Sequence, residues 1–425
     1  MRKIVLLFTC IAFRVGAQSI PPVSPQPTTR AASAVTGPLT LAQVLDLAHR
    51  SNPTLLSAVQ HLSAVRAQEV TAVLRQNPGA LVGAQMVTVS PGDSNGTEFY
   101  QFGISRLFER GGKRQARLDT ARSTTALTGF QLDDQSRQID LAIRQEFSRM
   151  LYAEQALNIS RENLEGYRKT VALMQVRLDV GAVDQTDFDR IELQLVAFES
   201  DVDNAELTLR QGSIALQALI GLPSASDKFS ITGTLNPAAV LTSIDQLRRD
   251  ALANRPDLKA AQAQLQTNAA AVKLAVANGT ADPTIEGEYE RAGYANTLGG
   301  SINIPLRIFD RNQGEKERAR YELESSRLAL TASQNQVVSD VDTAWAAYQT
   351  AQVQVARYRS KYLAEARHVR NNLEFSYRNG NSTLLDYLSA LSDYRQVNLA
   401  ALNANLQLLL SFEQLSYVTH TELVP

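Results

Sequence analysis

The stretch between Pro305 and Pro425 contains no proline and strongly constrains what this chain can fold into. Its apolar residues fall three and four positions apart, as in the series Val337, Val341, Ala344, Tyr348, Ala351 and Val355. This spacing is typical of a coiled-coil seam, and without proline nothing forces a break in a helix. We therefore expect two very long helices over about 313–415, joined by a tight turn at 379–381. The first arm, 313–376, would be roughly 95 Å long at about 1.5 Å per residue.

The two halves of the sequence repeat one another. Residues 41–55 align without a gap on residues 244–258, and each segment places a proline, Pro53 or Pro256, at the start of a second helix. In each half that helix ends at a further proline, and about 25 residues with strand character follow before the long helices. Agreement over so many elements indicates an internal duplication of one structural unit.

The duplication gives the expected division of the mature chain. The first repeat covers 39–220, a linker covers 221–242, and the second repeat covers 243–420. Each repeat holds a pair of strands followed by a long helical hairpin. The expected bounds are about 80–108 and 112–220 in the first repeat, and about 283–308 and 313–418 in the second.

The first residues are typical of a secretory signal peptide. Arg2 and Lys3 precede a short apolar run, and Ala17 offers a small residue at a cleavage point, so we expect 1–17 to be removed. Cys10 is the only cysteine and lies inside that run, followed by Ile11, so lipidation is not expected. A proline-rich tail over 18–38 would follow.

The strand regions indicate contact with a membrane. In the third strand, Ile285, Gly287 and Tyr289 alternate with Glu286, Glu288 and Glu290. Such alternation is typical of a wall with lipid on one side and water on the other, and equally of a half-buried strand in a water-soluble protein. Each run has about the ten residues that a tilted strand needs to span a bilayer. Because four strands cannot close a useful barrel, several chains would have to share one.

The composition gives no sign of catalysis or of nucleic-acid binding. The formal net charge is −1, so no basic surface is expected, and no nucleic acid is expected as a partner. The four histidines are scattered along the chain without ligand spacing, and we expect no metal site and no cofactor. Neither a phosphate-binding glycine loop nor a nucleophile–histidine arrangement is present, and we expect that the protein is not an enzyme.

The chain resembles the outer-membrane efflux channel family typified by TolC. The resemblance lies in two segments and in the duplicated order of elements, which is helix, helix, strand, strand, long helix, long helix. The segments are Pro305-Leu-Arg-Ile-Phe-Asp-Arg-Asn-Gln-Gly314 and Tyr377-Arg-Asn-Gly-Asn-Ser-Thr-Leu-Leu-Asp-Tyr-Leu388, the first similar to the heavy-metal branch related to CzcC and CusC. The resemblance implies a mainly α-helical chain with four transmembrane β-strands. It further implies a homotrimer with one twelve-stranded barrel in outer-membrane lipid and an α-helical tunnel of coiled-coil hairpins across the periplasm.

The resemblance also implies a function. The trimer would be the exit duct of a tripartite efflux system, docked to a periplasmic adaptor protein and an inner-membrane pump of the RND type. Heavy-metal cations are the expected cargo, with drug, solvent or peptide efflux or type I secretion as alternatives within the family. Outside the family, a periplasmic or secreted coiled-coil structural protein would explain the helical seams without a channel.

Matching positions carry over the expected site. Thr186 and Asp187 of the first turn would face Tyr377 of the second, and Asp386 would form an acidic ring at the narrowest point. Ser382 and Ser389 stand where TolC has an arginine of its closing network and a second ring aspartate, so a different lock, involving Arg378, is expected. Adaptor contact would fall on the two turns, and the lumen of the barrel would be acidic. These residues are Val180, Gly181, Asn379 and Gly380 in the turns, and Glu286, Glu288 and Glu290 in the lumen.

Each of these polar residues also has a simpler interpretation. Asp386 and Asp187 lie near helix starts, where an acid interacts favourably with the helix dipole. Tyr377 would then only cover the last turn of its helix. The glutamates would only form the solvated face of a strand.

Overall fold

The computed structural model describes residues 37–87, 97–222, 226, 229–235 and 240–421. The expected signal peptide and nearly all of the proline-rich tail therefore lie outside the described residues. The remainder is mainly helical with one small antiparallel sheet, which confirms the fold class expected from the sequence. No helix in the described part of the chain is both long enough and apolar enough to cross a membrane.

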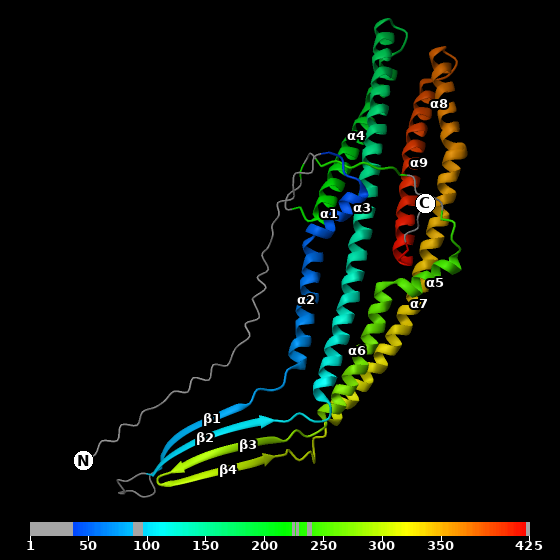
Figure 1. Ribbon diagram of the computed structural model, residues 1–425. Coiled ribbons are helices and arrows are strands. Elements are labelled where there is room, and N and C mark those ends of the chain that lie inside the picture. Colours follow the sequence, from blue (N-terminus) through cyan, green and yellow to red (C-terminus); the bar gives the residue numbers. More distant parts are fainter. Residues whose placement is uncertain (1–36, 88–96, 223–225, 227–228, 236–239, 422–425) are drawn as a thin grey trace, which may run out of the picture. The chain divides into compact units, whose positions relative to one another are not determined.

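The elements follow the same order in both halves of the chain (Figure 1). The first half contains α1 (Leu41–Ser51), α2 (Pro53–Val73), β1 (Gly79–Val87), β2 (Thr97–Leu107), α3 (Lys113–Asp179) and α4 (Gln185–Ile220). The second half contains α5 (Ile244–Asn254), α6 (Pro256–Asn278), β3 (Thr284–Ala292), β4 (Ala295–Asn303), α7 (Gln313–Arg357), the π-helical turn η1 (Tyr358–Tyr362), α8 (Leu363–Arg378) and α9 (Leu384–Thr419).

The long arm of the second hairpin differs from the sequence-based expectation. The seam predicts one continuous α-helix over 313–376, whereas the structure divides it into α7, the π turn η1 and α8. A π turn accommodates one additional residue, and it rotates the apolar stripe of α8 relative to that of α7. The arm of the first hairpin, α3, runs for 67 residues without such a turn, a length of roughly 100 Å.

Helix α3 is the element around which the others pack, because α2, α4, α6 and α9 all lie against it. Three apolar clusters hold this arrangement together. The first joins α1, α3, α4 and α9, and the second joins α5, α6, α7 and α9. The third joins the two hairpins near their turns and contains Leu164, Tyr167, Met174, Phe188, Ile191, Phe198, Leu384 and Tyr387.

The repeats differ at one helix start, and the difference creates a network of ion pairs. In the first half, the carboxamide oxygen of Asn52 accepts hydrogen bonds from the start of α2. The corresponding residue of the second half, Arg255, makes no such cap and is 5 % exposed. Its guanidinium donates to both carboxylate oxygens of Asp257, at 3.0 and 2.6 Å, and to Asp340 on α7 at 2.9 Å.

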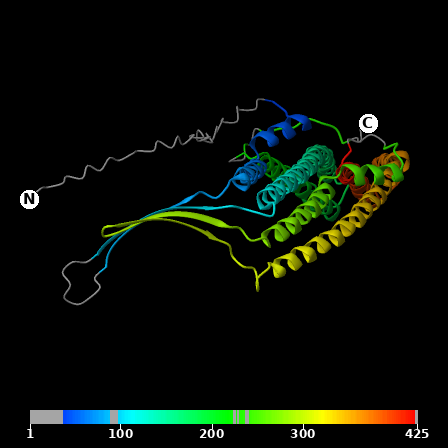
Figure 2. The same cartoon turned by 60° about the horizontal axis from the view of Figure 1, so that its bottom comes forward.

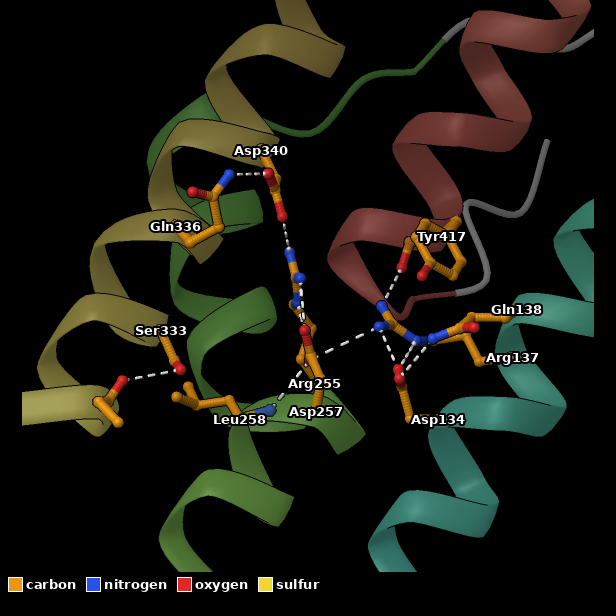
Figure 3. A network of polar contacts seen from close by, with 11 residues as sticks. Asp134, Arg137, Gln138, Arg255, Asp257, Leu258, Ser333, Gln336, Asp340 and Tyr417 are labelled. Carbon is orange, nitrogen blue, oxygen red and sulfur yellow. Dashed lines mark hydrogen bonds and ion pairs between the residues drawn. The ribbon is translucent and has the colours of Figure 1, made fainter. Parts of the chain in front are cut away.

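Arg137 of α3 extends this network to the first repeat (Figure 3). Its guanidinium lies 3.5 Å from Asp257, pairs with Asp134 at 2.5 Å, and donates to the carbonyl oxygen of Tyr417 at 2.9 Å. The network therefore joins α3, α6, α7 and α9. Buried charges that are paired in this way fix the relative position of the helices that carry them.

Candidate channel wall and gate

The four strands form one antiparallel sheet in the order β1-β2-β3-β4, with β1 and β4 at its edges (Figure 2). One cross-strand row joins Val82, Phe102, Tyr289 and Leu298, because each of these residues is paired with the next across the sheet. The exposed side chains in this row include Val82 at 74 % and Leu298 at 85 %. Ile104, Ile285 and Ile302 lie on the same face and are exposed too. This face of the sheet is therefore an uncovered apolar surface.

The opposite face is polar. Glu286, Glu288 and Glu290 lie in successive rows on it, as the alternation in the sequence predicts. The side-chain amide of Gln101 donates to Glu288 at 3.3 Å and to Glu290 at 3.4 Å, and the Ser301 hydroxyl donates to Glu286 at 3.3 Å. A sheet with one apolar and one acidic face fits a boundary between lipid and water.

The two hairpin turns have the same backbone geometry. Val180 and Asn379 each have φ −92° and ψ 4°, and the glycines that follow them, Gly181 and Gly380, have φ of 73° and 74°. In each turn, the amide after the glycine donates to a carbonyl oxygen five residues back, at 2.8 Å. This is a Schellman motif, in which glycine supplies the left-handed conformation. All four residues are exposed and open to a partner.

Tyr377 connects the two hairpins, but through residues other than those expected. Its ring stacks on Tyr387 with centroids 5.5 Å apart, and its hydroxyl donates to the sulfur of Met174 on α3 at 3.3 Å. The hydroxyls of Tyr387 and Thr170 lie 3.3 Å apart, which gives a further contact between α9 and α3. Burial raises the pKa of Tyr377, and the nearby charge of Arg177 opposes this shift.

Thr186 and Asp187 form no hydrogen bond with Tyr377 among the described residues, in contrast to the expectation. Thr186 is exposed at the start of α4. The backbone amide of Asp187 donates to the Asp184 carboxylate at 2.8 Å, and its own carboxylate lies 3.7 Å from Arg190. Asp187 is therefore engaged with its own helix and affects Tyr377 only through its charge.

At the turns, Arg177 reaches from the first hairpin to the second, and sequence reasoning missed it. The expected lock residue, Arg378, pairs with Glu374 of its own helix at 2.6 Å. Arg177 instead lies with its guanidinium 5.6 Å from the centre of the Tyr377 ring and donates to the carbonyl oxygen of Arg378 at 3.4 Å. A cation in the last turn of a helix interacts favourably with the helix dipole, and this alone explains an arginine at position 177. The sequence therefore gave no sign that Arg177 contacts the other hairpin.

Asp386 completes the start of α9. Its carboxylate accepts from the backbone amide of Thr383 at 3.2 Å and from the Thr383 hydroxyl at 2.6 Å, while its own amide donates to that hydroxyl. These hydrogen bonds lower the pKa of Asp386, and the side chain is exposed. The capping role is therefore present in the structure, and the exposed charge remains free to act on its surroundings. Neighbouring Ser382 has a buried hydroxyl without a hydrogen-bond partner in the described part of the chain.

Within the described residues, no three His, Cys, Asp or Glu side chains are grouped so that they could hold a metal ion.

Comparison with known proteins identifies the class to which this two-faced sheet and these paired hairpins belong. The structure is similar to that of a membrane protein from Pseudomonas aeruginosa, with a TM-score of 0.79 and 18 % sequence identity. The match covers 89 % of this chain and 92 % of that one. It is also similar to the structure of CusC, with a TM-score of 0.76 and 18 % sequence identity, over 89 % of this chain and 91 % of that one. The fold is therefore that of solved outer-membrane channels.

The sequence profile of the outer membrane efflux proteins matches residues 44–222 and 247–419, and the chain belongs to this family of channel proteins. It is 25 % identical over 364 residues to the cobalt-zinc-cadmium resistance protein CzcC of Cupriavidus metallidurans, covering 83 % of each chain. It is 23 % identical over 271 residues to toxin and drug export protein A of Aggregatibacter actinomycetemcomitans, covering 61 % of this chain and 58 % of that one. The resemblance drawn from the sequence is thereby confirmed.

Proposed function

We propose that three copies of this chain form the exit duct of a tripartite efflux system in an outer membrane. The sheet, with its apolar and acidic faces and its two edge strands, is the observation that carries this proposal. Edge β4 of one copy would pair with edge β1 of the next, so that three sheets close into one wall. The apolar face would then meet lipid, and the glutamates would line a water-filled lumen.

The hairpins would extend the duct into the periplasm and close it at their turns. Three exposed Asp386 carboxylates, one per copy, would form the acidic ring at the narrowest point. The contacts of Tyr377 with Met174 and of Arg177 with Arg378 would hold each pair of hairpins together in the closed state. A periplasmic adaptor coupled to an inner-membrane pump would bind at the exposed turns around Gly181 and Gly380.

Heavy-metal cations are the proposed cargo. Similarity to the cobalt-zinc-cadmium resistance protein over most of both chains supports this class, and an acidic wall favours cations. The ions would pass through with their hydration shells, and selectivity would rest with the pump. Export of drugs or toxins is the second candidate, supported by the similarity to the toxin and drug export protein.

Conduction by the purified protein in a planar bilayer tests the duct. We expect cation-selective channels whose selectivity falls in Asp386→Asn, since the ring would lose its charge. Asp184→Asn is the matched control because Asp184 caps the corresponding helix, α4, in the first hairpin. Equal effects of both variants would move the constriction elsewhere. A protein that never inserts, and that carbonate washes from membranes, would favour the coiled-coil structural protein and contradict the duct.

Growth of a strain that lacks its own copy tests the cargo. Complementation by this chain should restore tolerance to cobalt, zinc or cadmium, and the Asp386→Asn variant should restore less. Tolerance restored only to drugs would replace the metal proposal by the second candidate and leave the duct unaffected.

A further inference from the structure

Both repeats place two arginines around an aromatic residue close to the point where β2 or β4 ends. In the first half, Arg106 and Arg110 flank Phe108. In the second half, Arg307 and Arg311 flank Phe309, at the positions that correspond in the duplication. Neither the proposed gate nor the proposed channel wall requires these arginines or these aromatic residues.

The four guanidinium groups make no hydrogen bond or ion pair with the part of the chain that the structure describes. The contact of Arg106 is with a ring, since its guanidinium lies 5.2 Å from the centre of Phe108. Of the acids nearby, Asp310 accepts from the backbone amide of Asn312 at 2.8 Å, and the other two are engaged with other cations. Asp282 accepts from Lys113 at 2.5 Å, and Glu109 accepts from Arg117 at 2.5 and 3.0 Å. Arg307 acts on Asp282 through its charge alone, so none of the four guanidinium groups has a direct polar partner among the described residues.

A cavity of about 390 Å³ lies beside Arg106 and Phe108 of the first repeat. Its lining includes Arg75, Arg106, Phe108, Lys113 and Arg114, which come from the segment before β1, the end of β2 and the start of α3. The side chains of Arg75 and Arg114 also have no partner among the described residues. The charged side chains of the lining are cations except for Glu109, which pairs with Arg117, and of these cations Lys113 pairs with Asp282.

Apolar side chains surround the arginines. Arg106 is paired with Ile285 across the sheet and so lies at the edge of its apolar face. Leu306 and Phe309, on either side of Arg307, are 79 % and 89 % exposed. Aromatic and aliphatic groups beside long basic side chains are typical of the boundary between hydrocarbon and water, where the cation reaches the lipid headgroups.

We propose that these arginines form a binding collar for anionic phospholipid headgroups at the periplasmic edge of the strands. The inference rests on the proposed function, which places this edge at a membrane surface. Arg106, Arg110, Arg307 and Arg311 bind the phosphates, Arg75 and Arg114 extend the site into the cavity, and Phe108 and Phe309 enter the acyl boundary. A water-soluble phosphate would gain nothing from the exposed apolar side chains, which is why a lipid is favoured.

Lipid retention by the full-length protein tests the collar. The protein is purified from micelles with equal amounts of phosphatidylglycerol and phosphatidylcholine, and the lipids retained per chain are counted by mass spectrometry. We expect a preference for phosphatidylglycerol that falls about tenfold in Arg106→Gln/Arg110→Gln and in Arg307→Gln/Arg311→Gln. The matched control, Arg66→Gln/Arg367→Gln, removes two exposed arginines on α2 and α8 and should leave the preference unchanged.

Three further measurements separate the possible outcomes. Double Arg→Lys variants at the same positions keep the charge and should keep the preference, so a folding defect of the glutamine variants cannot imitate the result. Glycerol phosphate should not displace the retained lipid, and complete displacement would show a site for soluble phosphate instead. Conduction is measured on each preparation. Conducting channels without any lipid preference overturn the collar alone, whereas a protein that does not insert overturns the duct.

Discussion

The two hairpins end in turns with the same backbone geometry, yet the helices that lead into these turns are packed very differently. The last part of α3 buries Leu164, Tyr167 and Met174 in the apolar cluster near the turns. Helix α8, which occupies the corresponding place in the second hairpin, has no buried residue in this chain. Its partner α9 does contribute to the cluster, through Leu384 and Tyr387. Within the second hairpin, α8 is thus the loosely held helix.

The π turn lies at the N-terminal end of this loosely held helix, away from the hairpin turn. Tyr358–Tyr362 separates α8 from α7, whose seam is buried from Val337 to Val355. A π turn within a long helix weakens the regular hydrogen-bond ladder and is a frequent site of bending. In the proposed duct, α3 would therefore be the fixed support, and α8 would be the arm that moves when the gate opens. Contacts made by Tyr377 and Arg177 then decide whether the arm is held.

The largest expected effect tests whether α3 is the fixed support. Tyr167 is 1 % exposed, stacks on Phe198 with centroids 4.4 Å apart, and donates to the Ile191 carbonyl oxygen at 2.8 Å. Tyr167→Ala should lower the free energy of unfolding by about 3–5 kcal/mol. Phe375→Ala on α8, where the side chain is 69 % exposed, should change it by less than about 0.5 kcal/mol. Guanidinium unfolding followed by circular dichroism measures both, and a large loss for Phe375→Ala would show that another copy covers α8.

The buried ion network tests whether the two repeats are held together at a distance from the hairpin turns, where α3, α6, α7 and α9 meet. Arg255→Met should lower the free energy of unfolding by about 3 kcal/mol, because it leaves Asp340 without its cation and Asp257 with only the more distant Arg137. Arg249→Met, on the exposed surface of α5, is the control. An equal loss of stability in the control would show that the effect does not come from the buried ion pairs of Arg255.

The same network predicts the direction of a pH effect. Burial alone would raise the pKa of Asp257, but the hydrogen bonds and charge of Arg255 outweigh burial and lower it. The stability from this carboxylate is therefore present above the ordinary aspartate pKa of about 4 and is lost as the pH falls through the lowered value. Unfolding midpoints from pH 7 to pH 3 should converge between the wild type and Arg255→Met. Parallel curves would contradict the assignment.

The turn glycines give a smaller effect that distinguishes the two hairpins. A Cβ at Gly181 or Gly380 would meet no atom within 4 Å, so the penalty comes only from positive φ and is about 1 kcal/mol in each turn. Gly181→Ala should show this loss in global unfolding, since its helix is packed. Gly380→Ala should show it mainly as faster hydrogen exchange of amides in α8. The reverse pattern would exchange the roles given to the two helices.

The smallest effect concerns the contact that holds the arm. The interaction of Arg177 with the Tyr377 ring contributes about 0.5–1 kcal/mol, so Arg177→Gln should raise the open probability of the channel about threefold. Arg378→Gln removes an arginine that pairs within α8 and should leave gating unchanged. Single-channel recording compares the two. An increase in Arg378→Gln alone would return the lock to the residue that the sequence suggested.

Much of the fold follows from the sequence because its signals are local and repeated. The apolar seams predict the long helices, and the alternation around Glu288 predicts the two faces of β3. The π turn could not be predicted, since neither proline nor glycine occurs in Tyr358–Tyr362 and the turn follows from packing. Strand β1 gave little signal because Gly79, Ala80, Gly83 and Ala84 place small residues on both faces.

The site was less accessible to prediction than the fold. The cap of α9 is a local pattern, Thr383 followed three residues later by Asp386, and its role can be deduced from the sequence. The contact of Arg177 with Tyr377 joins residues far apart in the chain, and it depends on the rotation of each helix about its axis. A single sequence does not determine that rotation to within one side chain.

The two edge strands have a consequence for biogenesis. Strands β1 and β4 each leave a row of amide and carbonyl groups without a strand partner among the described residues. Hydrocarbon offers no hydrogen-bond partner to these amide and carbonyl groups. A single copy that entered a bilayer would therefore be destabilised by every unsatisfied group. If the duct is built from three copies as proposed, the copies would have to meet before or while they insert, and the rate of maturation would rise steeply with the amount of newly made chain. Scarcity of the protein, more than any defect in its fold, would then limit how many ducts a cell completes.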